Sequence, residues 1–570
     1  MKKPEKTIRQ HSANHAPEMP ALPYGFRISY RNAILTSILI LTFLLYARAL
    51  RNDFLTGWDD GEYLSEKVIS ESGPINVAEI FSNFNLGMYQ PLAILSFAIN
   101  HRTSGPSASA FILTNILLHL LNTFLTFRLA ERWMRKSPGD RPWIPAGIVA
   151  LLFAIHPMHV EAVAWISTRS SALYSAFFLG GLIAWDKYLE NGKKTGQYLT
   201  VLALATLSML SKSMAASFPL VLILIDFIRK RKISQAAILE KLPFLALSVV
   251  FGIVAIKASA SFGHITGLEQ DYSITERLAL IVYGISFYIR KLFSPTGLSA
   301  IYAFPEAEGG HLPAYVYTSA LWVAAAVLVI VLPKRYRREF LFGGFFFLLT
   351  ISMVLPLFWS RIFIVADRYT YIPYIGLFMI VARLLTDLWD IRSSIDRSTQ
   401  KLMILTTLLV FIMLGIASFN RIGVWKDTPT LLADVVEKKR SDADMAHGYF
   451  YLAGYYDASG EAGEAMKYYD LALSRNPNYV LAYNNRGILK GRAGENASAI
   501  KDFEAAIRIK PDYAEAYYNR GIAVYQSGDL HRACSDFEKA RSLGFRQAAE
   551  TINRYCRDAL PQAPEAAGAN

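Results

Sequence analysis

The chain places two adjacent carboxylates directly behind its first strongly apolar run. Residues 33–50 form that run, and the stretch behind it reads Gly57-Trp58-Asp59-Asp60-Gly61-Glu62-Tyr63. Because about 20 apolar residues cross the hydrocarbon core of a bilayer, the run predicts a membrane span. The glycines and carboxylates then lie in a loop at the mouth of that span. This loop is the first candidate for a catalytic centre.

The composition predicts a polytopic helical membrane protein. Of the 570 residues, 53% are hydrophobic and only 18% are charged, whereas soluble domains usually carry about 25% charged residues. The formal charge of +13 would also suit a nucleic-acid-binding protein. However, Lys and Arg gather in short loops between apolar runs, as the positive-inside rule describes for cytoplasmic loops. We therefore expect membrane lipid as a partner and no nucleic acid.

The apolar runs predict about eleven spans with a cytoplasmic N-terminus. They are 33–50, 108–131, 142–156, 160–189, 197–210, 214–228, 242–260, 314–333, 340–358, 369–388 and 402–420. The run 160–189 is longer than a simple span and is interrupted at 168–171, which predicts a broken or tilted helix. The stretch 277–293 is interpreted as a juxtamembrane or re-entrant helix, because a crossing there would put the basic cluster 334–338 outside.

This topology divides the first part of the chain into two regions. A basic cytoplasmic tail, 1–31, precedes a transmembrane domain, 32–420, whose long outer loops are 51–107 and 261–313. The first of these loops contains a short apolar stretch, 89–99, that we expect to lie along the interface as a helix. An odd number of spans leaves everything after the last span on the outer side.

The C-terminal part repeats with a period of 34 residues. Asn476-Pro477 recurs as Lys510-Pro511, and Tyr483 to Gly487 recurs as Tyr517 to Gly521. This period, with small residues where helices cross and Pro at the junction, is typical of tetratricopeptide repeats. The predicted order is a linker (421–442), three repeats with a capping helix (443–558) and a disordered tail (559–570).

The two cysteines, Cys534 and Cys556, lie in this repeat part. If the repeats are periplasmic, the compartment permits a disulfide between the third repeat and the capping helix. The alternative is a pair of buried thiols. The sequence contains no CxxC or Cys/His cluster with metal-ligand spacing.

Ionisable residues gather on the predicted outer side of the bundle. Such residues are costly near membrane depth and indicate a functional site. A carboxylate can deprotonate an acceptor hydroxyl, and cations can hold a lipid phosphate, so the set suits sugar transfer from a lipid-phosphate donor. The candidate catalytic residues are Asp59 and Asp60, and the candidate substrate-binding residues are His156, His159, Glu161, Arg169, Lys212, Asp367, Arg368 and Tyr369.

Each of these residues also has a purely structural interpretation. Their joint placement on one side is what favours the functional one. The structural alternatives are an Asx turn at Asp59-Asp60, a span end at His156-Pro157, an ion pair of Glu161 with Arg169 two helical turns on, a snorkelling Lys212 and an exposed ion pair of Asp367 with Arg368.

Several of these stretches resemble the transmembrane and tetratricopeptide-repeat containing protein family. The most specific match is 153–169, which contains Ile155-His156-Pro157-Met158-His159-Val160-Glu161 and ends in Thr168-Arg169. Further matches are Trp58-Asp59-Asp60, Gln90-Pro91-Leu92, Lys212-Ser213-Met214 and Ala366-Asp367-Arg368-Tyr369. The resemblance covers nearly the whole chain from about residue 33.

The resemblance implies a GT-C fold glycosyltransferase, similar to protein O-mannosyltransferases. It implies an acidic catalytic residue in the first outer loop, a polyprenyl-phosphate-linked sugar as donor, and repeats that face the lumen or periplasm. One departure matters. Ser170-Ser171 stands where bacterial relatives often carry Lys-Asp, so any substrate contact made by that Asp is missing here.

Two hypotheses of different classes follow. The first is an inverting glycosyltransferase of the bacterial inner membrane, which transfers a sugar to a protein or glycan acceptor in the periplasm. Asp59 is favoured as the base and Asp60 as the group that orients it, and the repeats recruit the acceptor. The alternative is a non-catalytic scaffold that presents periplasmic repeats for envelope assembly. A transporter function is a third and weaker hypothesis, because the spans show no internal duplication. Whether the reaction needs a divalent metal stays open, since two adjacent aspartates, Asp59 and Asp60, are weak evidence for a metal site.

Overall fold

The computed structural model describes residues 29–70, 73–135, 141–232, 234–261, 272–305, 311–331, 334–356, 363–391 and 396–556. Within these ranges the chain is built from α- and 3-10 helices, with an isolated β-bridge between Asn85 and Met88. The predicted all-α class is therefore confirmed. Most of the predicted tail 1–31 and all of the predicted tail 559–570 lie outside the described residues.

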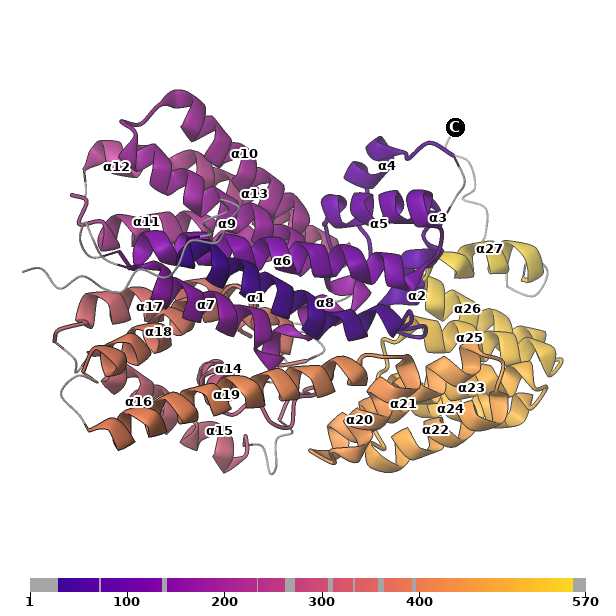
Figure 1. Cartoon of the computed structure of the whole chain (residues 1–570). Helices are drawn as coiled ribbons and strands as arrows, with labels where there is room; N and C mark the ends of the chain where they lie inside the picture. Colours follow the sequence, from indigo (N-terminus) through magenta and orange to yellow (C-terminus); the bar gives the residue numbers. More distant parts are fainter. Residues whose placement is uncertain are drawn as a thin grey trace, which may run out of the picture.

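The helices up to residue 424 form an elongated bundle in which the axes of α1, α6 and α19 are roughly aligned (Figure 1). In chain order they are α1 (Tyr30–Tyr46), η1 (Ala47–Arg51), α2 (Asp59–Ser65), α3 (Lys67–Ser70), α4 (Val77–Ser82), α5 (Pro91–Ser104), α6 (Ala108–Trp133), α7 (Trp143–Ile155), η2 (Pro157–His159), α8 (Glu161–Ala164), η3 (Ile166–Thr168), α9 (Arg169–Glu190), α10 (Thr195–Ser211), η4 (Ser213–Ser217), α11 (Phe218–Ile228), α12 (Gln235–Leu239), α13 (Leu242–Ser261), α14 (Ile274–Phe293), α15 (Ala314–Thr318), α16 (Ala320–Val331), α17 (Arg337–Ile351), η5 (Ser352–Val354), η6 (Asp367–Thr370), α18 (Tyr374–Ile391) and α19 (Arg397–Val424).

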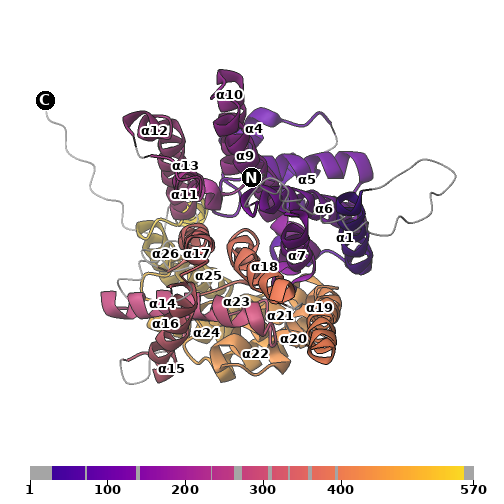
Figure 2. The same cartoon turned by 60° about the vertical axis from the view of Figure 1, so that its left-hand side comes forward.

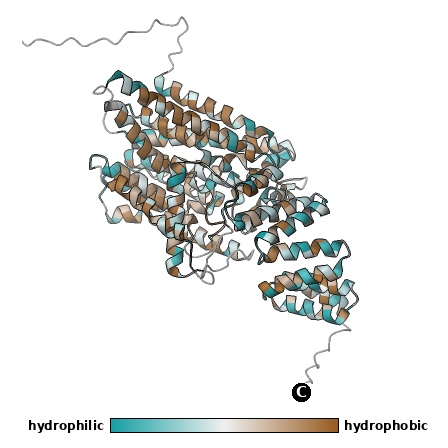
Figure 3. Cartoon of the chain, turned by 90° about the horizontal axis from the view of Figure 1, so that it is seen from below, coloured by the Kyte–Doolittle hydropathy of each residue, from teal (hydrophilic) through white to brown (hydrophobic). Residues whose placement is uncertain are grey.

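Apolar helices long enough to cross a membrane are present in the bundle, which makes the chain a multi-pass membrane protein. Among the described residues, five helical stretches qualify by length and composition, and the bent pair of α7 with Pro157–Ala164 would add a sixth. The other predicted spans coincide with helices that are shorter or less apolar, such as α10, α17 and α18. The count of eleven spans therefore stays a prediction. Figure 3 shows the apolar bundle beside the more polar repeats.

The charged groups of the bundle are sorted to its two ends. Asp186, near the end of α9, pairs with Arg132 of α6 at 3.2 Å and with Arg229 at 2.8 Å. Arg169 begins the same helix 17 residues earlier, about 25 Å away at 1.5 Å per residue. The predicted inner basic loops thus meet at one end, and the candidate site residues gather at the other.

Helix α6 carries a buried polar stripe through the core. Asn115, His119 and Asn122 are fully buried and recur at helical spacing on one face. His119 Nδ1 lies 2.7 Å from the Tyr371 hydroxyl, and Asn122 donates to the Ala172 carbonyl at 2.9 Å. Polar side chains between helices hold a membrane bundle together where apolar contacts alone give little preference over lipid.

The predicted broken helix at 160–189 breaks earlier than expected. The chain bends by 57° between α7 and the segment Pro157–Ala164, and α9 then runs unbroken from Arg169. Pro157 cannot continue α7, because it lacks the backbone N–H that the helix requires. Thr168 Oγ1 lies 2.9 and 2.6 Å from the Glu161 and Trp165 carbonyls, so its one O–H is shared between two of the carbonyls that the break leaves free.

The predicted repeat solenoid is confirmed as a series of helix pairs. Its helices are α21 (Asp442–Ala458), α22 (Ala462–Arg475), α23 (Val480–Arg492), α24 (Asn496–Ile509), α25 (Ala514–Gln526), α26 (Leu530–Ser542) and α27 (Arg546–Tyr555). Gly487 lies so close to Phe503 that an added Cβ would come within 2.7 Å of the ring, and Gly521 lies equally close to Phe537. The repeated glycines are therefore the points where the paired helices cross.

The repeats are docked on the end of the bundle that carries the candidate site residues. Helix α20 (Thr428–Glu437) lies within the predicted linker and leads directly from α19 into α21 (Figures 1 and 2). Asp53 N–H donates to the Lys426 carbonyl at 2.8 Å, and Asp444 of α21 accepts from the Ala303 N–H at 2.7 Å. The linker thus contacts the first of the two predicted outer loops, and the first repeat contacts the second.

A disulfide joins Cys534 of α26 to Cys556, just after α27. We expect alkylation under denaturing, non-reducing conditions to label neither cysteine, and prior reduction to expose both. Because the bond closes a loop of about 22 residues, replacing Cys556 with Ser removes an unfolded-state constraint of about 3 kcal/mol. Limited proteolysis should then cut near α27 first. Labelling of both cysteines without a reductant would contradict the bond.

Candidate active site

The first outer loop presents its carboxylates on a short helix. Trp58 is the extended N-cap residue of α2, and Asp59, Asp60 and Glu62 occupy the first turn. Gly57 precedes them with φ +76°, and a Cβ there would lie 3.1 Å from the Tyr455 Cα of the first repeat. This close approach and the left-handed backbone both require glycine. Negative side chains in the first turn also suit the positive end of the helix dipole.

Asp60 is a buried structural link. Its side chain is 1% exposed and accepts the Leu55 N–H at 3.0 Å and the Ser167 N–H at 2.9 Å, together with the Ser167 hydroxyl. Burial raises the pKa of Asp60 to about 6, and the Ser167 hydrogen bonds oppose the rise. Asp60 therefore ties α2 to η3, 107 residues further along the chain.

Asp59 differs from its neighbour. Its side chain is half-buried, and among the described residues no other residue donates a hydrogen bond to it. Burial raises the pKa of Asp59 to about 6, aided by the charge of Asp60 and opposed by the guanidinium of Arg368. A partly accessible carboxylate of this kind is free to accept a proton from a bound hydroxyl.

Glu161 and Arg368 form a buried ion pair beside this carboxylate. Glu161 is 1% exposed, binds the Arg368 side chain and accepts the Arg368 backbone N–H at 2.8 Å. The guanidinium also lies 5.3 Å from the Trp165 ring and 5.1 Å from the Tyr369 ring. The alternative pairing of Glu161 with Arg169 is therefore wrong, because the break before α9 puts the two residues on different helical segments.

Asp367 and Arg368 do not pair with each other as an exposed dipeptide. Asp367 is fully buried, accepts the Tyr302 hydroxyl at 2.7 Å and lies 3.5 Å from Arg421 at the end of α19. Burial raises the pKa of Asp367 to about 6, and Arg421 opposes the rise. Consecutive residues of η6 thus bind different partners, and the structural alternative of an exposed ion pair is wrong.

Arg169 and Lys212 each connect helices of the bundle, and Arg169 also contacts α5, which lies in the first outer loop. Arg169 is fully buried and donates to Asn115 at 2.9 Å, to the Phe111 carbonyl at 2.8 Å and to Ser96. It therefore clamps α5, α6 and α9 together. Lys212 donates to the Ser171 hydroxyl at 2.7 Å, at one of the two positions where bacterial relatives are expected to carry Lys-Asp.

The two histidines of the most specific motif are buried in the packing. His156 Nε2 lies 3.2 Å from the Leu292 carbonyl, and His159 Nδ1 lies 2.8 Å from the Phe153 carbonyl. Both rings pack against Tyr374 and Phe378 of α18. The structure thus brings together Asp59, Asp60, Glu161, Arg368 and Tyr369. Arg169 lies close enough to Asp60, and Asp367 close enough to Glu161, for their charges to interact, whereas His156 and His159 are buried among aromatic rings.

Sequence reasoning missed an aromatic column beside the carboxylates. Tyr451 of α21 lies 4.5 Å from Trp58, Trp58 lies 6.1 Å from Trp165, and Trp165 stacks on Trp425 at 5.4 Å. Ser167, which holds Asp60, was also missed, although it lies inside the matched stretch 153–169. Aromatic and hydroxyl side chains carry no charge, so a search for charged residues near membrane depth does not find them. Only their contacts in the structure show that they belong to the site.

The site offers no evident metal cage. In the part of the chain that the structure describes, no three His, Cys, Asp or Glu side chains gather that could hold a metal ion. Asp60 has its oxygens occupied by hydrogen bonds, and Asp59 alone is a poor cage for a divalent cation, which takes several oxygen ligands. The residues present therefore do not fit a resident metal.

Family models match the repeat part of the chain. Residues 446–479 match the model described as "Tetratricopeptide repeat", and residues 492–528 match the model described as "TPR repeat". Among solved structures, ArnT from Cupriavidus metallidurans bound to undecaprenyl phosphate is similar with a TM-score of 0.39 and 12% identity, over 89% of this chain and 80% of that chain.

Curated relatives match the membrane part as well. Protein O-mannosyl-transferase TMTC1 of Homo sapiens is 23% identical over 510 residues, which cover 78% of this chain and 55% of the relative. The Mus musculus protein of the same name is 31% identical over 159 residues, 26% of this chain and 16% of the relative. The chain thus spans about half the length of the human relative. The predicted resemblance to the transmembrane and tetratricopeptide-repeat containing protein family is confirmed.

Proposed function

We propose that the chain is an inverting glycosyltransferase with a GT-C arrangement. It takes a sugar from a polyprenyl-phosphate-linked donor and transfers it to a protein or glycan acceptor at the periplasmic face of the bacterial inner membrane. The observation that carries the proposal is Asp59, a half-buried carboxylate to which no other described residue donates a hydrogen bond, next to the Glu161–Arg368 pair. The relatives named as O-mannosyl-transferases support the same reaction class.

The proposed reaction is a single displacement at the anomeric carbon. The acceptor hydroxyl attacks this carbon, its proton passes to Asp59, and the bond from the carbon to the phosphate oxygen breaks with its electron pair on the lipid phosphate. Arg368 balances the charge that grows on the leaving phosphate, because part of its side chain, 19%, is exposed. Asp60 holds α2 so that Asp59 meets the hydroxyl.

The repeats are proposed to bring the acceptor to this site. Trp58, the residue before Asp59, packs on Tyr451 of α21, so the first repeat forms a wall of the catalytic loop. Arg440, just before α21, lies 4.4 Å from the ring of Tyr302, which in turn binds Asp367. A partner that binds the solenoid is therefore delivered close to the carboxylates. The alternative scaffold function assigns no task to Asp59 and is tested by the same experiment.

Replacing Asp59 with Asn should lower sugar transfer by roughly 10²- to 10⁴-fold, the usual effect of losing a general base. Asp60→Asn should lower transfer and also thermal stability, because a carboxylate that accepts three hydrogen bonds becomes an amide that donates. Purified variants are assayed for release of the lipid phosphate and for a sugar-sized mass gain on acceptors. Exposed Asp53→Asn in the same loop is the matched control. Equal transfer by wild type and Asp59→Asn would refute the proposed base.

The rate should rise between pH 5 and pH 7, with half of the maximum near pH 6. The reason is that a base works only when deprotonated, and burial raises the pKa of Asp59 to about 6. Below that pH the protonated carboxyl cannot accept the acceptor proton. A pH–rate profile with saturating donor checks this. A profile that falls above pH 6 would instead identify Asp59 as an acid, and a flat profile would remove it from the proton transfer.

A further inference from the structure

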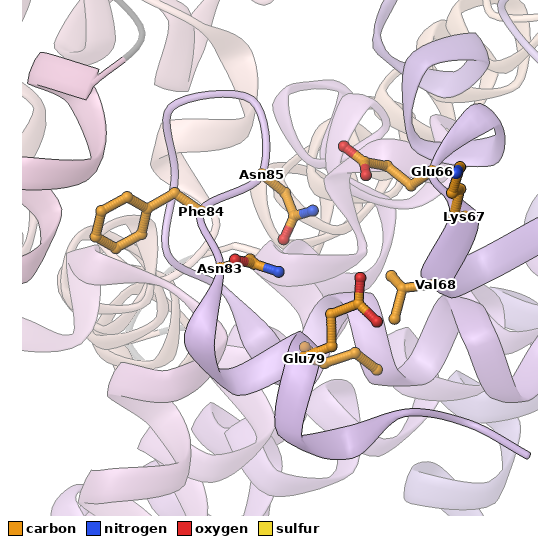
Figure 4. Close-up of a pocket in the computed structure, with 8 residues that line it drawn as sticks. Glu66, Lys67, Val68, Glu79, Asn83, Phe84 and Asn85 are labelled. Carbon is orange, nitrogen blue, oxygen red and sulfur yellow. The ribbon is translucent and has the colours of Figure 1, made fainter.

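A small hollow lies in the first outer loop, just beyond α2. Its volume is about 240 Å³, and its polar lining comes from Glu66 and Lys67 after α2, Glu79 of α4, and Asn83 and Asn85 of the following turn. Figure 4 shows the amides of Asn83 and Asn85 and the carboxylates of Glu66 and Glu79 turned toward a common space, while Phe84 points away from it. Asp59 does not line this hollow.

Asn85 is the residue that indicates a ligand. Its side chain is only 6% exposed, and its amide makes no hydrogen bond with any described residue. Its backbone is held by two hydrogen bonds to Met88, at 3.0 and 2.9 Å, across a turn in which Leu86 has φ +50°. An amide of a buried residue that opens into a hollow, without a partner in the described part of the chain, suits a ligand that supplies one.

The lining selects a small, neutral and hydroxyl-rich ligand. Amides both donate and accept hydrogen bonds, carboxylates accept them from hydroxyl groups, and Lys67 donates. Two carboxylates against one cation disfavour a phosphate, and no metal cage of three ligands occurs among the described residues. The volume lies below the roughly 300–1,000 Å³ of drug-sized sites. A single saccharide ring meets all of these conditions.

We propose that this hollow is a saccharide subsite that holds a sugar unit of a glycan acceptor. The inference rests on the proposed function and deepens it, because it names the acceptor class. Helix α2 joins the hollow to Asp59, since Glu66 follows the last residue of the helix that Asp59 begins, about 10 Å away at 1.5 Å per residue. The donor is the less suitable occupant, because its lipid phosphate would meet a negative lining.

Binding of free sugars tests the subsite without any need for transfer. The full chain in detergent is titrated with neutral hexoses, N-acetylhexosamines and their short oligosaccharides, followed by saturation-transfer NMR. We expect at least one of them to bind, and Asn85→Ala and Glu66→Gln to weaken it about tenfold. Exposed Asn478→Ala on the solenoid is the matched control and should bind like wild type. Failure of every sugar to bind, or unchanged binding by both variants, overturns the subsite.

Steady-state kinetics then distinguish the two sources of the sugar. For an acceptor subsite, Asn85→Ala raises the KM of the acceptor glycan about tenfold and leaves the KM of the lipid donor and kcat nearly unchanged. A rise in the donor KM alone overturns the acceptor assignment. If sugars bind but wild type transfers nothing to any glycan, the proposed function fails and the acceptor role with it, while the binding result still stands. Thermal melting of each variant excludes misfolding.

Discussion

The buried carboxylate of Asp60 is the contact on which the site end of the bundle depends. It accepts hydrogen bonds from Leu55 in its own loop and from Ser167 at the break before α9. A carboxylate can be buried there because those donors replace water, and removing them would leave an unpaired charge in an apolar wall. This link fixes the start of α2, and with it the position of Asp59. The two adjacent aspartates have different roles because Asp60 accepts several hydrogen bonds and Asp59 accepts none from another described residue.

A second constraint is the packing of the repeats on this same loop. Gly57 gives Tyr455 the space it needs, and the aromatic column from Tyr451 through Trp58 to Trp165 and Trp425 joins the first repeat to the bundle. Aromatic pairs of this kind each add roughly 0.5–1.5 kcal/mol beyond the burial of their area. The first repeat of the solenoid thus packs directly against the first outer loop and is not a separate domain joined only by a flexible linker.

The charged residues of the site illustrate what a sequence pattern can and cannot predict. The positive-inside rule and the cost of charge in lipid placed Asp59, Asp60, Glu161 and Arg368 at one end of the bundle, and the structure brings these four together. The sequence did not predict which of these charged residues form ion pairs with each other. Glu161 and Arg169 have helical spacing, yet the chain breaks between them and Glu161 pairs with Arg368, 207 residues away. Ser167, Tyr302 and Arg421 gave no signal, because neither periodicity nor local charge identifies a distant partner.

By itself the sequence determined the all-α class, the positions of the apolar helices and the 34-residue repeat, because these depend on local periodicity and on the length needed to cross a bilayer. It also determined that Asp59 and Asp60 lie in a loop at the mouth of the first span. Only the tertiary structure decided which aspartate is held and which is free, what each Arg contacts, and that Asn85 faces a hollow without a partner. Those properties depend on burial and on contacts between segments far apart in the chain, and no local pattern encodes them.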